Sequence, residues 1–546
     1  MDLLDQDVSP TRGTKRKYSG GQAMLMDSYF RLDALSGLNT DHTRRRIGGH
    51  KDEYHQHPVT PHMAKDQRET PNAIERYRND GYYKRLYRTE LDFRLLGQQD
   101  QEFGAVLERD SHLNFNNPVA VMQLTKTLLK LDFGLKIELP MDRLCPPVPN
   151  RHNYILWLKD LLDSSASSYL DQYDPTRQVT GLDIGTGASL IYPLLGCAQR
   201  PWSFIATDVD PRSLSYARKN AELNNYQSRI RVVDRIVTDL LIPLDELGVD
   251  TIDFVMVNPP FYVSDSELQG LARQKSRPPN GACTGAPIEM VCEGGEVGFV
   301  KRIIDESMTL RGRVQWYTSM LGKQSSLDTL VDILKDNCIT NYAVMAFIQG
   351  NRTRRWAIGW SFGNLRPAMS ASRGFEPSIG KGILPHPTEA TVALVSLSNI
   401  DPGQLSKAIC NSVATFDLVS WNWDEQRLRG IGFAGGNVWS RAYRRRKAQE
   451  QINASVMTGE TGKNQSYDQR VSSIKRSKHF ASYAFGFAIV ITPEQDANGA
   501  HRQATVVLRW LQGNDYALFE SFAGVLRNTI CIGDLAKDPH PSSRPR

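Results

Sequence analysis

Short apolar stretches alternate with amphipathic stretches over much of the chain, from about residue 118 to residue 362. Short apolar runs are typical of buried strands, and apolar residues spaced three and four apart are typical of helices. Strands that alternate with helices predict a parallel, doubly wound sheet. We expect helices at 118–133, 152–163, 188–195, 212–224, 296–308 and 325–336, and strands at 179–184, 203–207, 229–233, 252–257, 313–320, 342–348 and 355–362.

A second folded unit is expected at 389–535, after a linker at 366–388 that is interrupted by four prolines. Its pattern predicts an α+β domain, with strands at 391–396, 421–433, 485–491 and 504–511 and helices at 402–412 and 516–527. The polar stretch 448–478 is expected to be a disordered insertion. Residues 1–70 are polar without a sustained apolar period, so we expect a disordered N-terminal segment, and 536–546 form a tail.

Aromatic and basic residues alternate between residues 74 and 93. Such a pattern can follow a nucleic-acid backbone and stack its bases. The alternative is a helical arm that packs its aromatic side chains on the main domain. The sequence leaves both interpretations open.

Composition narrows the class of protein. The 546 residues carry 66 Lys and Arg against 60 Asp and Glu, and 40% are hydrophobic, which is enough for a large core. The sequence contains no run of about 18 apolar residues, so we expect no transmembrane helix. The first residues lack the pattern of a secretory signal, so we do not expect secretion. Seven dispersed cysteines without a Cys-x-x-Cys pair favour reduced intracellular thiols, and we expect no metal site.

Charge is concentrated in short basic clusters, although the net charge is only +6. Such clusters suit phosphate contact or nuclear import, and solvated loops are the alternative for each of them. They lie at 15–17, 44–46, 352–355 and 441–447.

A glycine turn follows the first predicted strand, at Gly185-Thr186-Gly187. Glycine at a strand-to-helix turn permits a ligand to approach the backbone closely. The turn lacks the third glycine of a pyrophosphate loop and the Gly-Lys-Ser/Thr of a P-loop, which favours a ligand with adenosine but without phosphate. An ordinary tight turn is the alternative interpretation.

An acidic residue at the end of the next strand supports this interpretation. Asp208 lies 23 residues after Gly185, near the offset at which an acidic side chain reaches ribose hydroxyls. Asp208 could instead cap the following helix. Asp210, which precedes Pro211, is the better candidate for that cap.

The stretch Asn258-Pro259-Pro260-Phe261 ends the fourth strand and indicates the reaction. Prolines stiffen a turn and remove backbone donors, so the carbonyls and the Asn258 side-chain oxygen form a cluster of acceptors. Such a cluster can hold an exocyclic amine and aim its lone pair at a methyl donor, while Phe261 stacks the base. A purely structural turn is the alternative.

These motifs together resemble the class I S-adenosylmethionine-dependent methyltransferases that methylate amino groups. The stretch from Leu182 to Leu195 closely resembles the methyltransferase-like protein 16 family, RNA adenine N6-methyltransferases that act on U6 small nuclear RNA. The resemblance implies a Rossmann-like domain at 71–365 with a mostly parallel seven-stranded sheet, and S-adenosylmethionine as methyl donor. It rests on the segments 151–157, 182–195, 293–296, 299–304, 316–317, 320–323 and 355–356, together with the Asn-Pro-Pro-Phe stretch.

The resemblance also implies roles for single residues around the donor and the target amine. Arg151 would pair with the carboxylate of the donor, although it could be a structural arginine at a helix start. Asp208 would bind the ribose, where animal members carry Glu. The predicted donor-binding residues are Arg151, Asp183, Gly185, Gly187, Ser189, Asp208 and Asn258, and the predicted target-amine clamp is Asn258, Pro259, Pro260 and Phe261.

Basic residues are the predicted RNA contacts. Lys275 and Arg277 belong to a loop that resembles one over the active site, and Arg352 and Arg355 resemble a pair that contacts the RNA backbone. In the second unit, Arg444, Arg445 and Arg446 are expected to contact phosphates. A nuclear-import signal is the alternative for the basic run at 441–447.

We therefore expect a nuclear enzyme that methylates an adenine of a structured RNA, with U6 small nuclear RNA as the expected substrate. One alternative is a methyltransferase of protein glutamine side chains, whose Asn-Pro-Pro is usually followed by Tyr. Another is an RNA-binding splicing factor with weak catalysis.

Overall fold

The computed structural model describes residues 78–263, 285–349, 353–374, 380, 382–397, 401–457, 483–495 and 501–532. The predicted N-terminal segment 1–70, the tail 536–546 and most of the predicted insertion lie outside these ranges. Within them, none of the helices combines the length and the apolar character that crossing a bilayer requires.

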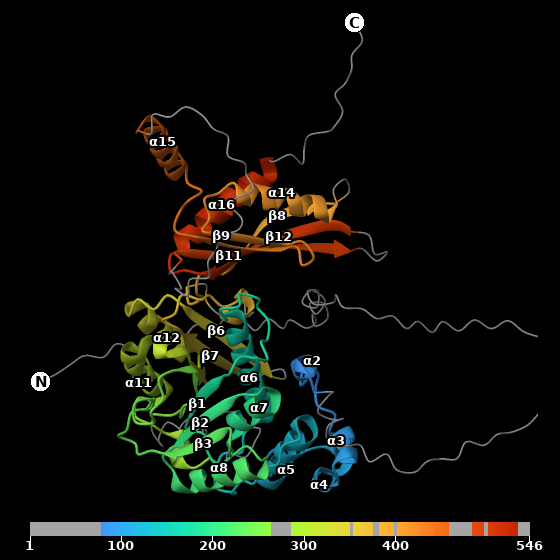
Figure 1. Ribbon diagram of the computed structural model, residues 1–546. Coiled ribbons are helices and arrows are strands. Elements are labelled where there is room, and N and C mark those ends of the chain that lie inside the picture. Colours follow the sequence, from blue (N-terminus) through green and yellow to red (C-terminus); the bar gives the residue numbers. More distant parts are fainter. Residues whose placement is uncertain are drawn as a thin grey trace, which may run out of the picture. The chain divides into compact units, whose positions relative to one another are not determined.

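The first folded domain is built on one sheet of seven strands (Figure 1). Its order is β3-β2-β1-β4-β5-β7-β6, in which β1 to β5 are parallel and β7 is antiparallel to both of its neighbours. The mostly parallel sheet was predicted, and the structure confirms it. The strands are β1 (Thr180–Ile184), β2 (Ser203–Asp208), β3 (Ile230–Asp234), β4 (Ile252–Val257), β5 (Val314–Leu321), β6 (Tyr342–Gln349) and β7 (Thr353–Trp360).

Helices cover both faces of this sheet, and each face has its own apolar core. One core contains Leu158, Leu194 and Ala217, which come from three helices on the same side; the other contains Ile303 and Leu330. The first three helices are α6 (Val148–Ser164), α7 (Ile191–Gln199) and α8 (Pro211–Leu223), and the other two are α11 (Gly295–Leu310) and α12 (Gln324–Asp336).

Two predicted helices have different bounds in the structure. Helix α7 begins at Ile191 rather than at residue 188, because Leu190 has a left-handed backbone (φ 52°) that interrupts the helix. The helix expected at 118–133 is α5 (Pro118–Leu128) followed by a π-helical turn at Leu129–Phe133.

The described part of the aromatic and basic stretch is an arm that packs on the sheet domain. It contains α2 (Asp80–Arg85), and α3 (Phe93–Gln99) and α4 (Gln101–Gly104) follow it. Tyr83 is 2% exposed and its hydroxyl donates to the Ala198 carbonyl. The Tyr87 hydroxyl donates to the Asp132 carboxylate at 2.7 Å. These rings are therefore used for packing, and base stacking by them is not supported.

The C-terminal half contains a separate antiparallel sheet with the order β8-β12-β11-β10-β9. Helices α14 (Pro402–Ala414) and α16 (Tyr516–Ile532) contribute Ile409 and Phe522 to its core. This confirms the predicted α+β domain. The strands are β8 (Glu389–Ser396), β9 (Ser420–Asp424), β10 (Arg429–Ala434), β11 (Phe485–Gln495) and β12 (His501–Gln512).

Two predictions for this half were wrong in part. The single strand expected at 421–433 is a hairpin, because the chain turns between β9 and β10. There the Asp424 carboxylate accepts the amides of Gln426 and Arg427, and Leu428 is left-handed (φ 48°). Helix α15 (Arg441–Met457) extends into the start of the stretch expected to be disordered.

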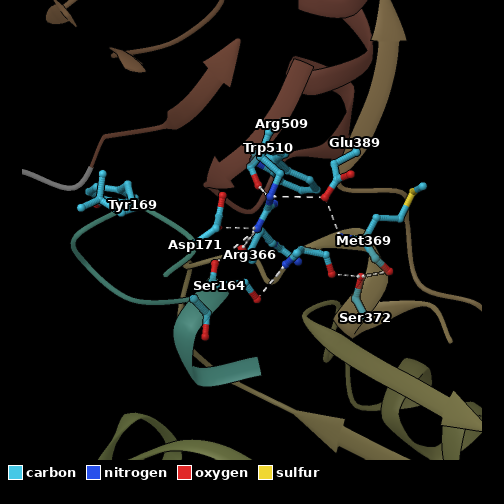
Figure 2. Close-up of polar contacts among 12 residues, drawn as sticks. Ser164, Tyr169, Asp171, Arg366, Met369, Ser372, Glu389, Arg509 and Trp510 are labelled. Atoms are coloured by element: carbon cyan, nitrogen blue, oxygen red, sulfur yellow. Dashed lines mark hydrogen bonds and ion pairs between the residues drawn. The ribbon is translucent and has the colours of Figure 1, made fainter. Parts of the chain in front are cut away.

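Polar contacts connect the first domain, the start of the predicted linker and the second domain (Figure 2). The predicted linker contains the short helix α13 (Met369–Ser372). Arg366 is 4% exposed, donates to the Gly513 carbonyl at 2.7 Å and lies 4.3 Å from the centre of the Trp510 ring. Buried Arg509 donates to the Arg366 carbonyl and forms an ion pair with Asp171 at 3.7 Å. The end of β12 is thus bonded both to the first domain, at Asp171, and to the start of the predicted linker, at Arg366.

Candidate active site

One cavity of about 640 Å³ lies at the carboxyl ends of β1, β2 and β4. In a doubly wound sheet, ligands bind where the strand order reverses, and β1 is the strand at which that reversal occurs here. The cavity is lined by predicted donor-binding residues from four separate parts of the chain. These are Arg151, Gly185, Gly187, Ser189, Asp208 and Asn258.

The glycine turn after β1 is open toward this cavity. Gly185 and Gly187 have φ angles of 69° and 65°, which favour glycine. A Cβ atom on Gly185 would meet nothing within 4 Å. The turn is held in place because the Thr186 amide donates to the Thr207 carbonyl at 2.9 Å and the Gly187 amide donates to Asp208 at 2.8 Å. The space beside the turn can therefore take a ligand close to the backbone.

Asp208 lines the cavity, and backbone amides hold both oxygens of its carboxylate in place. One oxygen accepts the Gly187 amide, and the other accepts the Asp210 amide at 2.9 Å. Burial raises the pKa of Asp208. Each carboxylate oxygen has a second lone pair that can accept a ligand hydroxyl. Asp210 caps α8 by accepting the Ser213 amide, as predicted, which leaves Asp208 to the cavity.

Asp183 lies behind the glycine turn and is not among the residues that line the cavity. One of its oxygens accepts the Thr186 hydroxyl at 2.7 Å, and the other has no hydrogen-bond partner among the described residues. Burial raises the pKa of Asp183 to about 7. The Asp183 side chain therefore stabilises the glycine turn through Thr186, and its second oxygen can accept one more hydrogen bond.

Arg151, on α6, is buried and lines the cavity. Its guanidinium donates to the Asn258 side-chain oxygen at 3.4 Å, lies 3.3 Å from the Met320 sulfur and stands 5.6 Å from the centre of the Tyr192 ring. It forms no ion pair with a carboxylate in the described part of the chain. A buried arginine without a carboxylate partner suits an anionic group of a ligand.

The proline corner after β4 opens onto the same cavity, through Asn258 and Pro260. Of the predicted clamp, Pro259 and Phe261 are outside the lining. The Phe261 ring lies under Arg355, whose guanidinium is 5.7 Å from the ring centre. Burial, with a contribution from nearby Arg151, lowers the pKa of Arg355. The glycine turn and the proline corner therefore meet at one site.

Two acidic residues at this site, Glu296 and Glu289, were not among the predicted site residues. Glu296 is buried and accepts the backbone amides of Gly322 and Lys323 at 2.6 and 3.1 Å, which fixes the end of β5 beside Phe261. Glu289 lines the cavity from the short helix α10 (Pro287–Met290). Glu296 belongs to a matched segment of the sequence, but nothing in the pattern around Glu289 distinguished it.

The predicted RNA contacts are placed only in part. Lys275, Arg277 and Arg352 lie outside the described residues. Arg444, Arg445 and Arg446 are exposed on α15. In the ranges that the structure describes, no three His, Cys, Asp or Glu side chains gather in a way that could hold a metal ion.

Comparison with known proteins finds sequence relatives among RNA methyltransferases. The profile of a family described as RNA methyltransferase matches residues 80–364. The U6 small nuclear RNA (adenine-(43)-N(6))-methyltransferase of Schizosaccharomyces pombe is 43% identical over 278 residues, which are 51% of this chain and 69% of that protein. The enzyme with the same name from Drosophila melanogaster is 33% identical, over 51% of this chain and 92% of that protein.

Vertebrate proteins and solved structures match the same half of the chain. The human RNA N(6)-adenosine-methyltransferase METTL16 is 45% identical over 46% of this chain, and the match spans 44% of the human protein. The human METTL16 catalytic domain in complex with MAT2A 3′UTR hairpin 1 is 41% identical, with a TM-score of 0.46, and covers 51% of this chain and 94% of that one. The N-terminal domain of human METTL16 in complex with SAH has a TM-score of 0.42 at 38% identity, over 51% and 98% of the two chains.

Proposed function

The chain belongs to the RNA methyltransferase family, and we propose that it methylates N6 of an adenine in a structured RNA, with U6 small nuclear RNA as substrate. The observation that carries this proposal is the single cavity shared by the glycine turn and the Asn258 corner. Relatives named for N6 methylation of adenine in U6 RNA support the choice of base and RNA.

S-adenosylmethionine is the proposed methyl donor, and the residues of the cavity fit it. Pockets for ligands of this size have volumes of about 300–1,000 Å³, and the cavity has about 640 Å³. The open side of Gly185 gives room beside the backbone, Asp208 can accept ribose hydroxyls, and Arg151 can pair with the carboxylate of the amino-acid part. When bound, the donor supplies an electrophilic methyl group.

The target amine is held by the proline corner. Asn258 and the Pro259 carbonyl accept the two amine hydrogens, and Phe261 stacks on the base. The Asn258 side-chain oxygen also accepts from Arg151, so a donor-binding residue orients the residue that binds the target. No strong base is needed for the attack, since the proton can leave after the methyl group has been transferred. Alignment of the two groups would account for most of the rate.

Basic surfaces would hold the RNA. Arg355 stands next to Phe261, where the phosphates that flank a splayed base would pass. The exposed arginines of α15 would bind a stem through its phosphates, largely independently of sequence. We place the protein in the nucleus on the basis of its basic clusters and this substrate.

The test is methylation of a U6 RNA transcript by the full chain with labelled S-adenosylmethionine, followed by nucleoside analysis. We expect label in N6-methyladenosine, and none with the Asn258→Ala variant, which should still bind the donor. Label in a protein glutamine side chain would favour the alternative enzyme. Full rescue by the Asn258→Ala variant, in cells that lack the protein, would favour a splicing factor.

A further inference from the structure

Glu289 is a third carboxylate at the donor cavity, and the reaction proposed above gives it no role. It lies on α10, about 30 residues beyond the Asn258 corner in the sequence, and is half-buried. The segment that carries it pairs with the backbone next to Phe261: the Tyr262 amide donates to the Met290 carbonyl, and the Cys292 amide donates to the Tyr262 carbonyl, both at 3.0 Å. Glu289 therefore reaches the cavity from an element fixed to the target corner.

The two oxygens of Glu289 have different surroundings. Oε2 accepts the Ala286 amide at 2.7 Å and the Leu144 amide at 3.0 Å, which joins two segments that are far apart in the sequence. Oε1 accepts no hydrogen bond from the described residues. It lies 3.9 Å from the point at which a Cβ atom on Gly187 would stand, so it faces the glycine turn.

Asp208 contacts the same glycine. The Gly187 amide donates to Asp208, and both oxygens of Asp208 already accept one backbone amide each. Two carboxylates thus line a cavity that is proposed to hold a ribose, and one oxygen of Glu289 accepts no hydrogen bond from the residues that the structure describes. A ribose offers two adjacent hydroxyl donors, and each ionised carboxylate oxygen is an acceptor.

We propose that Glu289 is a second ribose-binding residue, whose Oε1 accepts one hydroxyl of the methyl donor while Asp208 accepts the other. This inference rests on the proposed function, because it presumes an adenosine-containing donor in the cavity. It also gives the segment 285–292 a part in donor binding. That segment would then be bonded both to the donor and to the backbone next to Phe261.

The Glu289→Gln variant separates this contact from the structural bonds. The Ala286 and Leu144 amides require an acceptor at the Oε2 position, so the amide oxygen of glutamine should take that place. The NH₂ group then stands where Oε1 stood, and an ionised acceptor is lost while the bonds between segments remain. Glu222→Gln, at an exposed position on α8, is the matched control.

The experiment measures calorimetric affinity of the full chain for S-adenosylmethionine and for 5′-methylthioadenosine, which keeps the ribose but lacks the amino-acid part. A lost hydrogen bond to a charged group corresponds to about 10- to 100-fold in affinity. We expect Glu289→Gln to weaken both ligands by a similar factor in this range, with an unchanged melting temperature and no effect of Glu222→Gln.

Several results would overturn the assignment. Unchanged affinity for both ligands would exclude the contact, and a loss confined to S-adenosylmethionine would place Glu289 at the amino-acid part instead. A lowered melting temperature together with the loss would show a structural role only. If the unaltered chain binds neither ligand, the proposed function itself is wrong. If the unaltered chain binds both ligands and only the effect of Glu289→Gln is missing, this inference alone is wrong.

Discussion

Gly322 lies directly after β5, against the ring that is proposed to stack the target base. A Cβ atom at this position would stand 2.8 Å from Cδ1 and 3.2 Å from Cε1 of Phe261, and 3.3 Å from a carboxylate oxygen of Glu296. Carbon atoms in contact prefer a separation of about 3.5 Å or more. In the Gly322→Ala variant the ring must therefore retreat by about 0.7 Å, taking the difference between that separation and 2.8 Å.

This displacement should impair turnover and leave donor binding intact. Misplacement of a reacting group by about 1 Å can reduce the rate about 100-fold, so we expect kcat to fall about 10- to 100-fold for a shift of this size. Neither Gly322 nor Phe261 lines the donor cavity, so the Kd for S-adenosylmethionine should not change. Overpacking should also cost about 1–3 kcal/mol of stability.

The assay is steady-state methylation of U6 RNA, with calorimetry for the donor and thermal unfolding for the fold. Gly312→Ala is the control, because a Cβ atom there would meet nothing within 4 Å. If Gly322→Ala turns over like the unaltered protein, the position of Phe261 does not govern the reaction. If it loses affinity for the donor, the position of the Phe261 ring and donor binding are not independent.

Three further predictions concern stability and RNA binding. Burial raises the pKa of Asp183 from 3.8 to about 7, so the unfolded chain binds fewer protons between these values and stability should fall as the pH rises through that range. In the Asp183→Asn variant, the free energy of unfolding measured with urea should differ less between pH 5 and pH 8 than in the unaltered protein. The same difference in both proteins would contradict the raised pKa of Asp183. Asp80→Ala removes the carboxylate that pairs with Lys159, which is 1% exposed, and should cost about 3 kcal/mol or more. Asp160, whose side chain is 45% exposed, pairs with Lys84, and the Asp160→Ala change should cost less than about 1 kcal/mol in the same assay. Equal losses in the two variants would contradict this expectation. Changing Arg444, Arg445 and Arg446 to Ala should weaken RNA binding and lower the slope of log Kd against log salt by about 2–3. Donor affinity should stay the same, and an unaltered salt slope would exclude these arginines from the interface.

The sheet domain was predictable because its signals are local and agree with one another. The strand at 252–257 has the bounds expected from its apolar run, which ends where two prolines prevent further pairing. Asp210 was expected to cap α8 from its place before Pro211, and it does so. Glycine at positions 185 and 187 marked a turn that requires positive φ.

What the sequence did not predict depends on contacts between distant residues. The hairpin of β9 and β10 has no glycine or proline at its turn and is made by bonds to the Asp424 side chain. Tyr83 and Tyr87 suited base stacking equally well until the burial of Tyr83 and the hydrogen bond from Tyr87 to Asp132 were known. The Glu289 side chain is positioned by the backbone amides of Leu144 and Ala286. Leu144 is far from Glu289 in the sequence, so no spacing predicts this contact.

The central claim is that the donor pocket and the Asn258 corner form one continuous cavity. The most direct measurement is the affinity of a conjugate in which N6 of adenosine is linked to the sulfur-bearing end of a donor analogue. We expect the conjugate to bind more tightly than either half, and to lose affinity in both the Asp208→Ala and the Asn258→Ala variants. If it binds no better than the donor half, and Asn258→Ala leaves its affinity unchanged, the two sites are not joined and the account is wrong.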